Sequence, residues 1–187
     1  MSKTPSKHLR IIVVDCRHES MEKERSQEFL ASLKDSLHEY VSLADAEFSA
    51  FKDERRKNFL FGLVTIEESA NLIISPVPFD LSHLNKKLKE WTPKSVPIHS
   101  LGNSVLIQAL KLAQKTVLQL KKSFQQFNFE VHLSLLSEHL IGLQKEASFF
   151  GELEKLILTG GKRDLLEFVL LSFPLPLSSH LSDTFLE

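Results

Sequence analysis

The side chains best suited to chemistry follow the first apolar run of the sequence. Asp15, Cys16, Arg17, His18 and Glu19 are consecutive and include no glycine. Two carboxylates can hold a divalent cation or transfer a proton, and a thiol beside Arg17 and His18 becomes a nucleophile if its pKa falls. This polar run is therefore the first candidate site.

The catalytic alternatives lack supporting motifs. Cys16 has no defined base partner, and a dinucleotide site would need glycines after the first strand. Residues 159–162 read Thr-Gly-Gly-Lys, but Arg163 stands where a phosphate loop has its magnesium-binding hydroxyl, so we interpret the glycines as the end of a helix. Ser104 lies outside any nucleophile-elbow pattern. The eight histidines show no metal-ligand spacing. We therefore predict no catalytic residue, no cofactor and no enzyme activity.

The elements that position the polar run begin with a buried strand. Residues 11–14 are β-branched without alternation, which is typical of the centre of an α/β sheet. Apolar residues at helical spacing from Phe29 to Val41 predict a helix, and the mixed charges of residues 45–58 predict a loop.

The later segments predict an α/β order. Residues 59–66 and 71–74 form a predicted hairpin that Pro76 and Pro78 should end. A helix capped by Asp80 or Ser82 follows, and residues 104–124 form the longest predicted helix. A strand over 129–136, a helix over 142–158 and a strand over 168–173 complete the series. The sheet is expected to be mainly parallel, with the hairpin as an antiparallel edge and helices on both faces.

Composition limits the class of protein. The 187 residues suit one domain, predicted over 9–177, with a flexible N-terminus over 1–8 and a tail over 178–187. The 23 basic and 24 acidic residues give no basic excess for coating nucleic acid. A single cysteine and the lack of a long apolar segment indicate an intracellular protein, in the nucleus or cytoplasm, that does not enter the membrane.

Three segments resemble the metal loops of a von Willebrand factor A (VWA) domain. They are residues 11–20, which end the first strand at Asp15; residues 102–110, with Ser104 at the helix opening; and residues 131–139, with Glu138 after a later strand. The element order also matches that family over about residues 9–177. The resemblance implies a Rossmann-like VWA fold.

The departures from the VWA pattern affect the metal site. The family places two serine hydroxyls after the aspartate, where this chain has Arg17 and Glu19. Ser104 could replace the family's threonine and Glu138 its second aspartate, but Arg17 would repel a divalent cation. The resemblance therefore implies a degenerate site that holds no metal ion and contains an ion pair between Arg17 and Asp15 or Glu138.

The resemblance implies a protein-interaction scaffold whose partners are other protein subunits. Among intracellular VWA-like domains, the chain is most similar to the N-terminal region of the meiosis 1 arrest family, which would imply a nuclear role in meiotic recombination. Two alternatives stay open: a metal-dependent VWA binding module, and an enzyme of an unrelated α/β class that uses Cys16 or the carboxylates.

Overall fold

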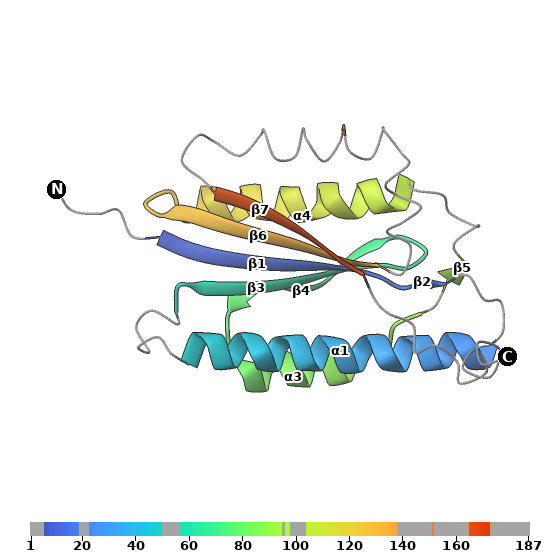
Figure 1. Ribbon diagram of the computed structural model, residues 1–187. Helices are drawn as coiled ribbons and strands as arrows, with labels where there is room; N and C mark the ends of the chain where they lie inside the picture. The colour runs from blue at the N-terminus through green and yellow to red at the C-terminus, as the bar shows by residue number, and fades with distance from the viewer. Residues whose placement is uncertain are drawn as a thin grey trace, which may run out of the picture.

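A five-stranded sheet runs through the molecule between helices on its two faces (Figure 1). The computed structural model describes residues 6–18, 23–49, 57–94, 96–97, 104–137, 151 and 165–172. The strand order is β4-β3-β1-β6-β7. These strands are β1 (Ser6–Asp15), β3 (Phe59–Ile66), β4 (Ala70–Pro78), β6 (Asn128–Ser137) and β7 (Leu165–Ser172).

The predicted parallel arrangement is confirmed, with β1 in the middle. It pairs in parallel with β3 on one side and with β6 on the other, and β7 continues the parallel order beyond β6. The antiparallel hairpin of β3 and β4 lies at one edge, as predicted. The carboxyl ends of β1, β3 and β6 therefore meet at one end of the sheet.

The two faces of the sheet carry separate apolar clusters. On one face, α4 (Ser104–Ser123) packs Leu106, Leu110 and Ala113 against β1, β3 and β6. On the other face, α1 (Lys23–Ser49) and α3 (Leu81–Glu90) cover the opposite side chains of the same strands. Figure 1 shows this layering, with α4 above the sheet and α1 and α3 below it. Helices on both faces were predicted, and this is confirmed.

β1 begins earlier than the predicted domain boundary at residue 9. Ser6, Lys7 and His8, expected in the flexible N-terminus, pair with β6, and this expectation is corrected. The Lys7 amine lies 4.8 Å and 4.6 Å from the ring centres of Phe124 and Phe127, and burial lowers the pKa of Lys7. These contacts stabilise the polar residues 6–8 as part of the sheet.

Pro76 and Pro78 were predicted to end this strand, but β4 continues through Pro78. β4 has a neighbour on one side only, and a proline that lacks an amide hydrogen is tolerated at such an edge. The pairing with β3 shifts around Leu63, and Pro76 Cγ lies 3.0 Å from where a Cβ on Gly62 would be. The glycine thus leaves room for the proline ring.

Helix α1 extends through Ser49 and includes residues 45–49, which were predicted as a loop. Ala44 continues the buried stripe of Leu37 and Val41 and packs near Phe59. This packing outweighs the local polar composition. The next helix starts as predicted, because the Asp80 carboxylate accepts a hydrogen bond from the His83 amide at 2.9 Å.

Some predicted segments fall outside the described residues. The helix over 142–158 does so except for Gly151, which is helical, and so does the tail over 178–187. The last strand is present as β7, and it begins three residues before the predicted start at 168. In the part of the chain that the structure describes, no helix has the length and apolar character to cross a membrane.

Candidate functional site at the carboxyl end of β1

The described part of the polar run, Asp15 to His18, is buried rather than exposed. Arg17 and His18 form β2 (Arg17–His18), which pairs in parallel with β5 (Val96–Pro97) in a separate two-stranded sheet. The prediction of a loop is therefore wrong for Arg17 and His18. The His18 ring stacks on Phe29 with 4.8 Å between centres, so aromatic packing and strand pairing hold the backbone here.

Arg17 and Asp15 form a buried two-point ion pair, which confirms the predicted contact. Arg17 Nε donates to Asp15 Oδ1 at 2.8 Å, and Nη2 donates to Oδ2 at 2.7 Å. The Arg17 backbone amide also donates to Oδ1 at 3.1 Å. Both residues have a relative exposure of 0%. Planar geometry and exclusion of water make this a strong and directional contact.

Ser137 completes the cluster, and the sequence prediction missed it. Its hydroxyl donates to Asp15 Oδ2 at 3.0 Å, and the residue is 1% exposed. The sequence could have indicated Ser137, because it is the last residue of β6. The carboxyl end of a strand that pairs in parallel with β1 must lie beside Asp15. The prediction chose the next residue, Glu138, instead.

The other predicted site positions are less well placed. Ser104 begins α4 and is exposed to solvent, unlike the buried Asp15 and Ser137. Glu19 and Glu138 lie outside the described residues. The convergence of Asp15, Ser104 and Glu138 therefore stays a prediction.

Cys16 does not have the reactive environment that its neighbours suggested. It is fully buried, and burial raises the pKa of its thiol well above the ordinary value, with further increases from the negative charges of Glu67 and Asp15. A thiolate is therefore disfavoured at neutral pH. The expectation that Arg17 and His18 lower this pKa is corrected, because Arg17 is paired with Asp15.

The residues at this site do not fit a divalent metal ion. Both oxygens of Asp15 already accept hydrogen bonds from Arg17, whose guanidinium carries a permanent charge next to the carboxylate. A cation at Asp15 would have to displace that group and bear its repulsion. Over the described ranges, no group of three or more His, Cys, Asp or Glu side chains is arranged to hold a metal ion.

Two histidines gather around a glutamate near the opposite end of β1 and β6. His8 Nδ1 lies 2.8 Å from Glu130 Oε2, and His132 Nε2 lies 3.7 Å from Glu130 Oε1. His8 also stacks on Phe59. The contacts of His8 join β1 to β6 and to β3, whereas His132 and Glu130 belong to the same strand. These partly exposed contacts stabilise the sheet and are not part of the Asp15 cluster.

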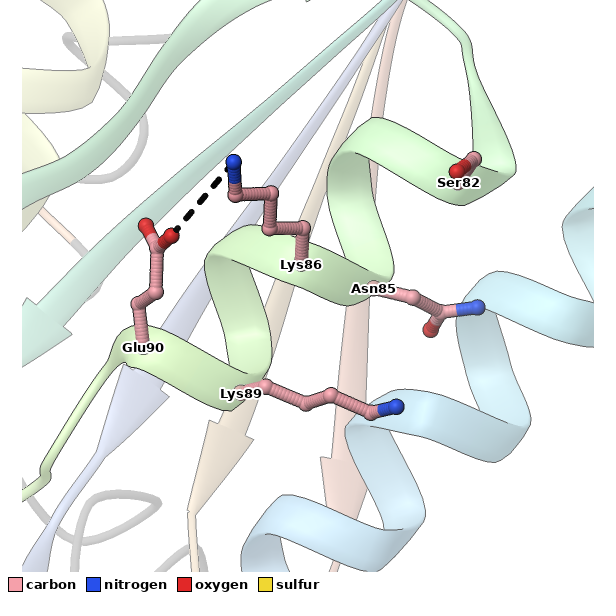
Figure 2. A pocket seen from close by; sticks show the side chains of 5 residues that line it. All are labelled: Ser82, Asn85, Lys86, Lys89 and Glu90. Carbon is pink, nitrogen blue, oxygen red and sulfur yellow. Dashed lines mark ion pairs between the residues drawn. The ribbon is translucent and has the colours of Figure 1, made fainter.

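A hollow of about 550 Å³ lies beside α3, away from the Asp15 cluster. It is lined by Ser82, Asn85, Lys86, Lys89 and Glu90. In Figure 2, Lys86 points toward Glu90, 4.0 Å away, while Asn85 and Lys89 point toward α1. Asn85 is engaged by His38 of α1 at 2.8 Å. The lining is polar and comes from one helix, unlike the apolar and enclosed sites that bind small molecules.

Comparison with solved structures identifies the fold. Proximal thread matrix protein 1 from the mussel byssus superposes with a TM-score of 0.53 at 12% identity, over 89% of this chain and 37% of its own. An aerotolerance-related membrane protein from Bacteroides fragilis gives 0.53 at 11% identity, over 91% and 74%. BatB from Bacteroides thetaiotaomicron gives 0.51 at 12% identity, over 88% and 65%.

The chain has a VWA-like fold. No family model and no curated protein sequence matches it significantly. The chain spans well under half the length of the mussel chains. The mussel protein has also been solved with zinc in its MIDAS motif. In the VWA-like chain described here, the first aspartate of the resemblance is held by Arg17 instead.

Proposed function

We propose that this chain is a non-catalytic protein-interaction module that binds its partners without a bridging metal ion. The observation that carries the proposal is the ion pair between Arg17 and Asp15. It occupies both oxygens of the carboxylate that the VWA resemblance assigns to metal binding.

Binding without a metal ion is expected because the cation at this site, Arg17, is not accessible to a partner. A metal-dependent module would hold a divalent cation in a shell of oxygen ligands, and the partner would meet that cation. Here the cation is part of the chain, is fully buried, and has its Nε and Nη2 atoms directed at Asp15. Binding would therefore depend on contacts with the surrounding surface and not on coordination.

The chemistry of the site supports a binding role over an enzymatic one. The raised pKa of Cys16 disfavours a nucleophilic thiolate, and the polar hollow beside α3 includes none of the groups at the Asp15 cluster. Small-molecule sites usually combine an enclosed cavity with converging polar groups.

The proposal is tested by affinity purification of the tagged protein from a cell extract, in parallel with EDTA and with Mg²⁺. We expect the same protein partners at similar yield in both conditions. Recovery only with Mg²⁺ would favour the metal-dependent alternative, and absence of any reproducible protein partner would contradict an interaction module.

The nuclear and meiotic part of the hypothesis depends on the sequence resemblance alone. It predicts that the purified partners include recombination proteins and that the tagged chain concentrates in nuclei of germ cells. Exclusion of the chain from those nuclei would reject this role and leave the metal-independent binding proposal intact.

A further inference from the structure

The two helices on opposite faces of the sheet carry opposite charge. Helix α4 contains four lysines and no acidic residue, and the sequence has no Asp or Glu from residue 91 to residue 129. Helix α1 contains six acidic and three basic residues, for a net charge of −3. Helix α4 is thus a basic element on one face of the sheet. Helix α1 is an acidic element on the other face, where the neighbouring α3 carries three lysines and one glutamate.

On α4, the basic charge follows the outermost line of the helix. Lys111, Lys115 and Lys122 are exposed and recur at helical spacing, and Leu118 lies between them with 43% of its surface exposed. The buried positions Leu106, Leu110 and Ala113 are on the other side, against the sheet. We call Lys111, Lys115, Leu118 and Lys122 the basic stripe.

Helix α1 carries a matching line on the other face of the molecule. Glu28, Asp35 and Glu39 are exposed, and Leu43 follows Glu39 by one turn with 64% exposure. We call these four residues the acidic stripe. Large exposed apolar side chains are few among the described residues: Leu43, Leu72 and Leu118. Two of these three therefore lie in the two charged stripes.

The two stripes are opposite in sign and similar in spacing. Asp35, Glu39 and Leu43 follow one another at intervals of four residues, and Lys111, Lys115 and Leu118 at intervals of four and three. At ~1.5 Å per residue, each set spans about 10–12 Å of helix. In Figure 1, α1 and α4 run in the same direction, from right to left. A second copy shifted along the normal to the sheet would thus lay its α1 parallel to the first copy's α4.

We propose that copies of this chain associate head to tail, with the acidic stripe of one copy against the basic stripe of the next. Asp35 then faces Lys111, Glu39 faces Lys115, and the two exposed leucines, Leu43 and Leu118, meet about one turn beyond the second charged pair. Such a contact uses two different surfaces, so one stripe stays exposed at each end and further copies can add. The apolar pair excludes water beside the second charged pair, and the charges set direction and register.

A charge-swap experiment tests this contact by sedimentation velocity over a concentration series. Variant A carries Lys111→Glu and Lys115→Glu, and variant B carries Asp35→Lys and Glu39→Lys. We expect the wild-type protein to sediment above the 21.3 kDa monomer at ~0.05 M NaCl and to dissociate at ~1 M, where the screening length falls to about 3 Å. Each variant alone should stay monomeric, because its two stripes then have the same sign. An equal mixture should associate again, because each variant supplies the stripe that the other lacks.

The control is Lys86→Glu with Lys87→Glu, which reverses two exposed lysines on α3 and should associate like the wild type. Circular dichroism checks that each variant is folded. If variant A does not fold, Lys115→Gln with Lys122→Gln removes the charge more gently and should weaken association at least fivefold. A wild-type protein that is monomeric at every concentration, association that survives ~1 M salt, or a mixture that stays monomeric would each overturn the proposal.

Discussion

Arg17 and Asp15 are two residues apart in sequence, and they face each other through two side-chain hydrogen bonds of 2.8 Å and 2.7 Å where neither residue has exposed surface. The pair works as a unit. Each charge is expensive to bury alone, and each removes most of that cost for the other.

Replacing Arg17 alone should therefore be costly. Arg17→Met leaves a buried carboxylate without its cation, and we expect the free energy of unfolding to fall by ~3–5 kcal/mol. Urea denaturation at pH 7 measures the change. The double variant Asp15→Leu/Arg17→Met should recover most of the loss, and Lys94→Met, at an exposed lysine, should change stability little. A single variant as stable as the wild type would show that the pair is not structurally important.

Magnesium should not stabilise the wild-type protein. A ligand that binds only the native state raises the melting temperature, but Arg17 already holds both oxygens of Asp15. We expect no shift in thermal unfolding with ~10 mM Mg²⁺, a concentration that would reveal even a weak site through binding linkage. Arg17→Ser removes the competing cation, so any Mg²⁺-dependent stabilisation should appear only in that variant. A rise of several degrees in the wild type would refute the metal-free interpretation.

The Ser137 hydroxyl should contribute measurably to the same cluster. It donates to a buried carboxylate at 3.0 Å, and a hydrogen bond to a charged group contributes ~1.5–3 kcal/mol. Ser137→Ala should lower the free energy of unfolding by about this amount, as measured by urea denaturation. In the Asp15→Leu/Arg17→Met background the same substitution should have little effect, and an equal loss in both backgrounds would mean that Ser137 acts elsewhere.

The buried side of α4 should be sensitive to truncation and its exposed side should not. Leu110 is fully buried, so Leu110→Ala should cost ~2–5 kcal/mol, as in other large-to-small core substitutions. Leu118→Ala on the same helix should change the monomer's stability by less than ~0.5 kcal/mol. Thermal or urea unfolding at high salt compares them, and similar losses would mean that the helix is oriented differently.

Cys16 should react slowly and should make stability depend on alkaline pH. Its pKa is raised in the folded protein, so the unfolded chain releases the thiol proton first as pH rises above the ordinary value of 9.0. The stabilising contribution is thus complete below pH 9 and is lost at higher pH. The wild type should lose stability relative to Cys16→Ala above that pH, and iodoacetamide should label native protein far more slowly than urea-unfolded protein. Rapid labelling of the native thiol would contradict its burial.

Much of the fold could be predicted from local patterns. The β-branched run over 11–14, the stripe from Phe29 to Val41 and the capped start of α3 carry their information in neighbouring residues, because periodicity and capping are local properties. The order of these elements also predicted the parallel sheet, since right-handed crossovers allow few alternatives. The boundaries of the elements were less predictable. Helix α1 includes residues 45–49 because Ala44 is buried near Phe59, a contact between distant parts of the sequence.

The sequence by itself placed Asp15 at the end of a buried strand and put a permanent cation two residues later, which was enough to expect an ion pair. Only the tertiary structure decided that Asp15 is the partner of Arg17, that both residues are buried, and that Ser137 supplies the third member from 122 residues away. It also decided that burial raises the pKa of the Cys16 thiol. The physical reason is that burial and strand adjacency depend on which distant segments pack together, and this sets both the charge environment and the partners of each side chain.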